Sequence, residues 1–294
     1  MVQKNKGQQF ILNLLFIILC LLCVLPFVLL ISSSFTEEAA LTQKGYWFWP
    51  WKVSMDAYKY LMNSGSQILT SYKITLLVTA IGTVSNIMLT VLFAYPLSRR
   101  EMPARNFFAF FVFFTMLFNG GIIPAYMMYA NFLHLKNTFW ALIIPWKLLG
   151  AFNIIMMRSY FTASIPNELV EAARIDGARE YGILFRIMLP LSKPMLATIG
   201  LMTGLGFWND WTNSIYFVTQ KNLYSIQALL NDIMTNIQFL QNNTQMQQHA
   251  NQMNLPSASV RMAIAVIGIL PIFAIYPFVQ KYFVKGIVVG GVKG

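Results

Sequence analysis

The sequence predicts an all-α polytopic membrane protein with six transmembrane helices and with both termini in the cytoplasm. The 294-residue chain is 57% hydrophobic and only 11% charged, whereas soluble domains carry about 25% charged residues. It contains six apolar runs of roughly 20 residues, the length that a helix needs to cross a bilayer. Runs of this length exclude barrel strands, which alternate over about 10 residues.

The first expected span is an anchor that we expect to be retained. Its apolar core exceeds the 7–15 residues of a secretory signal, and no cleavage pattern follows it. Cys20 and Cys23 lie inside it without polar partners, so we interpret them as two small buried hydrophobes rather than a redox or metal pair. The six expected spans cover residues 10–32, 72–97, 106–130, 137–157, 194–218 and 259–282.

The net charge of +11 is explained by membrane orientation and not by nucleic-acid binding. Positive charge near span ends sets the orientation of a membrane protein, with the basic side inside. Six crossings from a cytoplasmic N-terminus place most of the basic residues inside: Lys4, Lys6, Arg99, Arg100, Arg105, Arg158, Arg174, Arg179, Arg186, Lys193, Lys281, Lys285 and Lys293.

The two sizeable loops expected outside show no catalytic or metal-binding set. The loop at 33–71 carries Trp47, Trp49 and Trp51, which favour an aromatic belt at the membrane surface over direct contact with a ligand. The loop at 219–258 is rich in Gln and Asn. His134 and His249 have no companions at metal-ligand spacing. The tail GIVVGGVKG lacks the phosphate-loop pattern, so we expect no nucleotide site and no enzyme activity in this chain.

The cytoplasmic segment 164–193 is the most densely charged part of the chain. Its sequence predicts a short helix with Ser164 as its cap and Pro166 in its first turn. Gly177 then ends this helix, because glycine adopts the positive φ of a helix terminus without strain. A second helix is expected from Ala178 to about Leu189, followed by Pro190 and Pro194 at the entry to the fifth span.

This helical pair is predicted to dock against another protein. A helix that rests on lipid headgroups carries stripes of bulky apolar and basic residues, whereas this one carries alanines and acids. Small side chains permit close backbone approach, and carboxylates orient the contact. The docking residues that we expect are Glu171, Ala172, Ala173, Asp176, Gly177 and Ala178.

The pattern Glu171-Ala172-Ala173, then Gly177 and later Leu189-Pro190, resembles the EAA loop of binding-protein-dependent ABC importers. Further motifs resemble the carbohydrate-uptake branch of that family, of the MalG and LplC type. They are the intramembrane Trp208-Asn209-Asp210-Trp211, the NGGIIPAY segment at 119–126 and the ending Lys285-Gly286 with Lys293-Gly294. With the six spans, the resemblance covers nearly the whole chain.

The resemblance implies a type I ABC importer transmembrane fold in the bacterial cytoplasmic membrane. The EAA loop would act as a coupling helix in a groove of a cytoplasmic ATPase. The implied partners are a second homologous permease subunit, two ABC ATPase subunits, an extracytoplasmic solute-binding lipoprotein and membrane lipid. No cofactor is expected in this chain, since ATP and magnesium would be used by the ATPase.

Polar residues at membrane depth form the second candidate site. Charges there are costly and usually face a cavity or a partner. Lys147 and Asp210 lie near indole and amide side chains, which suit a sugar because they supply ring stacking and hydroxyl partners. The alternatives are a Lys147–Asp210 ion pair or a shallow position for Asp210, and Lys147 is also a candidate contact for a uronate carboxylate. The expected substrate-pathway residues are Asn209, Asp210, Trp211, Trp208 and Lys147.

The function expected from the sequence is ATP-driven uptake of a sugar or oligosaccharide, acidic ones included, by alternating access. An ion-coupled secondary transporter or channel is the alternative. It would need its own coupling site, built from broken helices and coordinating carboxylates. One deep acid among six spans argues against that class, and the lack of catalytic sets argues against an integral-membrane enzyme.

Overall fold

The computed structural model describes residues 6–62, 65–242 and 258–290. Over these residues the fold is helical, and the one β pairing is an isolated antiparallel bridge between Thr36 and Val53. The chain divides into two compact units, residues 1–66 with 230–272 and residues 67–229 with 273–294. His249 and the last residues, Lys293 and Gly294, lie outside the described part.

The first unit begins with α1 (Lys6–Ser34), which contains the first expected span. Cys20 and Cys23 are exposed, so the prediction that they are buried was wrong for this chain by itself. The described part of the chain leaves the apolar window of α1 uncovered, so lipid or a partner must cover these residues. Two short helices follow, α2 (Glu38–Lys44) and α3 (Asp56–Met62).

Glu38 fixes the start of α15 (Ala258–Gly290) within the first unit. Its Oε1 accepts the backbone N–H of Ala258 at 2.9 Å, and its Oε2 accepts the N–H of Ser259 at 2.9 Å and that residue's hydroxyl at 2.8 Å. The first N–H groups of a helix have no partner within the helix. A carboxylate there also complements the helix dipole, so Glu38 caps a helix that begins 220 residues later in the chain.

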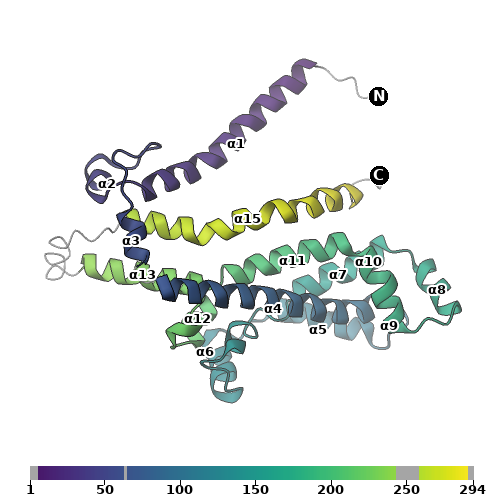
Figure 1. Cartoon of the computed structure of the whole chain (residues 1–294). Coiled ribbons are helices and arrows are strands. Elements are labelled where there is room, and N and C mark those ends of the chain that lie inside the picture. Colours follow the sequence, from purple (N-terminus) through teal and green to yellow (C-terminus); the bar gives the residue numbers. More distant parts are fainter. Residues whose placement is uncertain (1–5, 63–64, 243–257, 291–294) are drawn as a thin grey trace. The chain divides into compact units, whose positions relative to one another are not determined.

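The second unit is built around α4 (Gly65–Ser98), α7 (Ala151–Ser164) and α11 (Lys193–Trp208), which contribute to one buried cluster and run alongside one another (Figure 1). Glycines let α11 lie close to α4 at two positions. A Cβ at Gly200 would lie 3.2 Å from Ile87 Cδ1, and one at Gly204 would lie 3.5 Å from Thr83 Oγ1. The two helices therefore approach closely at both positions, while a Cβ at Gly206 would meet open space.

Two helices, α1 and α4, are long and apolar enough to cross a membrane, and the count of spans in the described residues rises to four if two bent pairs are included. The expected span at 106–130 is α5 (Arg105–Leu117), a break, α6 (Ile122–Tyr126) and the π-helix η1 (Met127–Phe132), with a bend of 113°. The other pair joins residues 180–191 to α11 at 80°.

The expected spans at 137–157 and 194–218 are helical over only part of their length. The first holds a short 3-10 helix, η2 (Phe139–Leu142), and then turns until α7 begins at Ala151. Pro145 has no N–H to donate, and Trp146 has a φ of +58°, so a continuous helix cannot form there. The second is α11, a break at residues 209–211, and α12 (Thr212–Phe217). The short η4 (Lys221–Leu223) and α13 (Ile226–Asn242) follow.

Candidate functional site

The expected docking segment forms α8 (Asn167–Ile175), which projects beyond the ends of α7 and α11 (Figure 1). The start of this helix differs from the expectation. Ser164 is the last residue of α7 and caps nothing, and Pro166 occupies the N-cap position without a side-chain hydrogen bond. Ile165 between them is buried, and this burial sets the course of the chain into α8.

Gly177 ends α8 as the sequence predicts. Its φ is +79°, its N–H donates to Arg174 O at 3.0 Å, and the N–H of Ala178 donates to Ala173 O at 2.9 Å. These two bonds make a Schellman motif, in which a residue with positive φ satisfies the last carbonyls of a helix. The second helix is present as α9 (Glu180–Ile183), the π-helix η3 (Leu184–Met188) and α10 (Leu189–Leu191).

One face of α8 packs on its own chain, and the other is open. Val170 and Ala173 are buried in the cluster with α4, α7 and α11, so Ala173 faces inward, unlike the other expected docking residues. The apolar Ile175 is 87% exposed, which costs free energy unless a partner covers it. The expected docking residues on the open surface are Glu171, Ala172, Asp176, Gly177 and Ala178.

A polar tie connects α8 to the end of α4. Glu180 accepts a hydrogen bond from the Tyr95 hydroxyl on one carboxylate oxygen and one from Arg174 Nε, at 2.9 Å, on the other. Arg174 Nη1 also lies 3.7 Å from Glu101 Oε1. The hydrogen bond from Tyr95, with help from Arg174, lowers the pKa of the Glu180 carboxyl.

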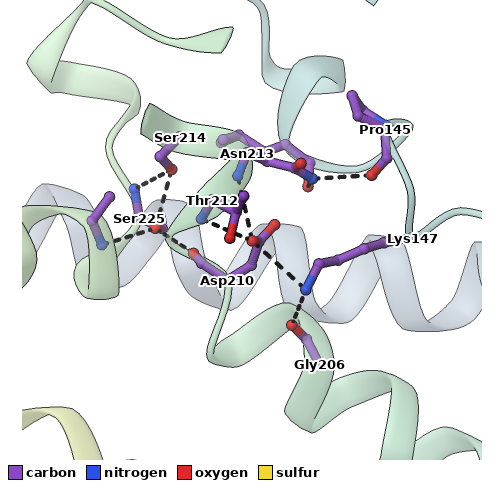
Figure 2. Close-up of polar contacts among 10 residues, drawn as sticks. Pro145, Lys147, Gly206, Asp210, Thr212, Asn213, Ser214 and Ser225 are labelled. Atoms are coloured by element: carbon purple, nitrogen blue, oxygen red, sulfur yellow. Dashed lines mark hydrogen bonds and ion pairs between the residues drawn. The ribbon is translucent and has the colours of Figure 1, made fainter. Parts of the chain in front are cut away.

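The break after α11 is organised by Asp210, which is buried (Figure 2). Its Oδ1 accepts the backbone N–H groups of Thr212 at 3.1 Å and Asn213 at 3.4 Å, and so it caps α12. Its backbone carbonyl accepts the hydroxyl of Ser225 at 2.8 Å. Asp210 therefore has a structural role in joining α12 to the start of α13.

Lys147 and Asp210 form the ion pair that was the alternative interpretation. Lys147 Nζ lies 3.6 Å from Asp210 Oδ1 and donates to the carbonyl of Gly206 at 2.6 Å (Figure 2). The lysine side chain is 29% exposed and that of the aspartate is 6% exposed. A buried charge needs a partner of opposite sign and further hydrogen bonds. Lys147 and Asp210 are each other's partner of opposite sign.

The remaining pathway candidates are split by burial. Trp208 is 3% exposed, and its ring centroid lies 6.3 Å from that of Tyr72 in α4. Asn209 and Trp211 are exposed, Trp211 at 48%. Of the five predicted residues, the structure brings Lys147 and Asp210 into direct contact and leaves Asn209 and Trp211 open to a ligand or partner.

Sequence reasoning missed a second polar group, centred on Asn86 of α4. Its amide donates to the carbonyls of Lys147 and Leu148 at 2.9 and 3.1 Å. Its Oδ1 accepts from Asn153 at 3.1 Å and Thr203 at 3.3 Å. An asparagine in the middle of an apolar run is the signal that points to it, because an unpaired amide is costly there. No group of metal-binding residues occurs in the described part of the chain.

Comparisons with known proteins agree with these features. Residues 102–289 match the family described as "Binding-protein-dependent transport system inner membrane component". The chain is 37% identical over 271 residues to protein LplC of Bacillus subtilis (strain 168), covering 92% of this chain and 90% of that one. It is 36% identical over 291 residues to the polygalacturonan/rhamnogalacturonan transport system permease protein YtcP of the same organism, covering 99% and 100%.

A solved structure has the same fold. The crystal structure of a bacterial ABC transporter involved in the import of the acidic polysaccharide alginate matches with a TM-score of 0.80 and 31% identity. The match covers 96% of this chain and 99% of that one. The chain therefore belongs to the binding-protein-dependent transport system inner membrane components, the non-catalytic, multi-pass permease subunits of ABC transporters in the cytoplasmic membrane.

Proposed function

We propose that this chain is the permease of an importer for a sugar or oligosaccharide, and that a separate ATPase drives it through the segment 164–193. The observation that carries the proposal is the form of α8. Its inner face is anchored in the core by Val170 and Ala173, and the end of its outer face exposes Ile175 at 87%. A helix that is anchored in the core on one side and open to a partner on the other can transmit motion from that partner to α4, α7 and α11.

The proposed topology has six spans with both termini in the cytoplasm, at the ranges given above. Basic residues concentrate near the ends of the spans that would face the cytoplasm. The helices α5 and α1 have outward apolar surfaces, with no buried residue in α5, which suits contact with lipid or with another subunit. This orientation places the open face of α8 on the side where ATP is available.

The proposed partners are a second, homologous permease, two ABC ATPase subunits and an extracytoplasmic solute-binding lipoprotein. The chain offers a docking helix but shows no phosphate-binding loop in its sequence, so the energy for transport must come from another subunit. Relatives named for polygalacturonan transport and for alginate import support a carbohydrate substrate, acidic ones included.

The proposed substrate path runs past the break after α11. Asn209 and Trp211 are exposed there and supply an amide and an indole, the groups that bind sugar hydroxyls and ring faces. Asp210 and Lys147 pair with each other, and Trp208 is buried. We propose that Asp210, Lys147 and Trp208 hold the shape of the path. Asn209 and Trp211 are proposed to contact the substrate.

The test of the proposed function is a charge reversal at the docking face. In proteoliposomes that contain the full importer, Glu171→Lys is expected to abolish retention of the ATPase and sugar-stimulated ATP hydrolysis. Asp56→Lys, the same change at an exposed acid of the outer loop, is the matched control and should retain the ATPase. Full stimulation of hydrolysis by sugar in Glu171→Lys would remove the coupling assignment.

A further inference from the structure

The second unit contains a cavity that the coupling segment and the pathway residues do not account for. It is wide open to the surface, and its volume is about 780 Å³, within the range of roughly 300–1,000 Å³ typical of small-molecule sites. Its wall includes the indole of Trp146, the ring of Tyr129, the turn Asn119–Gly121 and the hydroxyl residues Thr115 and Thr212. None of the described residues that line it carries a formal charge.

Trp146 enters this cavity in an unusual conformation. Its φ is +58°, a region that bulky L residues rarely adopt and that marks a strained or functional position. Its indole is 39% exposed, and it packs edge-on against Tyr129 and Tyr216 with centroid separations of 6.4 and 6.2 Å. Its nearest ring is that of the buried Phe217, with a centroid separation of 5.4 Å, and the rest of the indole is left open at the cavity.

The chain on both sides of Trp146 is held by the polar groups described above. The carbonyl of Pro145 accepts the amide of Asn213 at 3.1 Å (Figure 2), and the carbonyl of Lys147 accepts the amide of Asn86 at 2.9 Å. The side chain of Lys147 is tied to Gly206 and Asp210. These contacts hold the turn in its strained form, with the indole at the cavity.

The polar part of the wall has free hydrogen-bonding capacity of both kinds. Asn119 uses its Oδ1 to accept the N–H of Gly121 at 2.9 Å, which leaves its amide N–H groups to donate. Thr115 donates its hydroxyl to the carbonyl of Val112 at 2.7 Å, which leaves its oxygen to accept. Sugar hydroxyls both donate and accept, and they match this arrangement.

We propose that this cavity is a binding site for one sugar ring, which stacks on Trp146 and bonds through its hydroxyls to Asn119 and Thr115. This inference rests on the proposed function. Because the lining is uncharged and the ammonium of Lys147 is bound by its own chain, the site binds a ring through its C–H face and its hydroxyls and does not select a carboxylate. Any preference for acidic sugars arises elsewhere in the importer.

The test compares two substitutions at Trp146, and both new residues must adopt the same positive φ at this position. In the reconstituted importer with saturating binding protein, Trp146→Leu is expected to lower the uptake rate roughly three- to tenfold, because it removes an aromatic contact. Trp146→Phe keeps a ring and should stay within about twofold of the unchanged protein. Both effects should be equal for a neutral trisaccharide and for a trisaccharide of uronates.

Two further variants separate loss of the site from loss of the fold. Trp140→Leu changes another half-exposed indole that does not line the cavity and should leave uptake unchanged. Gly120 has open space where a Cβ would lie, so Gly120→Leu should partly fill the cavity and slow uptake without changing the thermal unfolding of the complex.

The outcomes separate this inference from the proposed function. Equal uptake by Trp146→Leu and Trp146→Phe would overturn the ring site, and so would a loss confined to the acidic trisaccharide. Either result would leave the proposed function intact as long as Glu171→Lys still abolished uptake. If the unchanged importer took up neither sugar, the proposed function itself would fail.

Discussion

At the scale of single residues, Lys147 and Asp210 show why the sequence alone left two interpretations open. The sequence places one base and one acid in apolar surroundings, but 62 residues separate them. The structure joins them at 3.6 Å and adds the cap that Asp210 makes on α12. The pair therefore stabilises the break after α11, because each charge would otherwise lie away from water without a partner.

Removing one member of this pair should cost more than neutralising both. Lys147→Met is expected to destabilise the protein by about 2 kcal/mol, below the ~3–5 kcal/mol for fully buried pairs, because the lysine is partly exposed. Adding Asp210→Asn should recover part of that loss, since asparagine keeps the capping oxygen and removes the stranded charge. Thermal unfolding of the two variants in detergent measures this, and a double variant less stable than Lys147→Met alone would contradict it.

Gly177 gives a second prediction at this scale. Its φ of +79° favours glycine, although a Cβ there would meet no atom of this chain within 4 Å. Gly177→Asn should fold almost normally, because asparagine tolerates positive φ, whereas Gly177→Leu should cost about 1 kcal/mol. If the docking role is correct, both side chains still weaken binding of the ATPase, and only the leucine variant also loosens α8 in hydrogen exchange.

At the scale of elements, the tie between α8, α9 and α4 explains how the proposed coupling segment is held. Glu180 uses both carboxylate oxygens, one for Tyr95 of α4 and one for Arg174 of α8. The guanidinium of Arg99 lies over the Tyr95 ring, 5.1 Å from its centroid. A shift of α8 is therefore passed to the end of α4 through side chains as well as through the core.

This tie should depend on pH. The pKa of Glu180 is lowered in the fold, so its contribution is present above the ordinary carboxyl pKa of about 4 and is lost as the pH falls through the lowered value. Tyr95→Phe removes only the hydroxyl and should loosen the segment by about 1 kcal/mol at pH 7. Proteolysis at Arg179 across pH 3–7 measures this, and cleavage should become faster as the pH falls. Glu180→Gln should remove this pH dependence. If cleavage of Glu180→Gln still became faster at low pH, another group would be responsible for it.

The helices also show which parts of the fold the sequence predicts and which it does not. Apolar length located α1, α4 and α15, because twenty apolar residues in a row have few alternatives to a helix in a membrane. Local chemistry located Gly177 as the end of α8. The breaks at 118–121, 143–150 and 209–211 were missed, because hydropathy does not register hydrogen bonds between distant groups, such as those of Asn213 to Pro145 and of Asn86 to Lys147.

At the scale of the whole molecule, the proposed orientation is open to direct measurement. A cysteine at Gln220, exposed in the loop after α12, should react with a membrane-impermeant thiol reagent added outside. A cysteine at Arg179, exposed beyond α8, should react only after the membrane is permeabilised. Cys20 and Cys23 are first replaced by serine as a background. The reverse pattern would invert the topology and would move α8 away from ATP.

We propose that the open face of α8 is the surface on which the ATPase sits. A photo-reactive amino acid at Ile175, which is 87% exposed, tests this most directly in the intact importer. Illumination should join the permease to the ATPase subunit, whereas the same group at Met202, 49% exposed in the middle of α11, should label only lipid or another membrane subunit. Labelling of lipid alone from Ile175, with the ATPase present and active, would mean that the ATPase sits elsewhere on the permease.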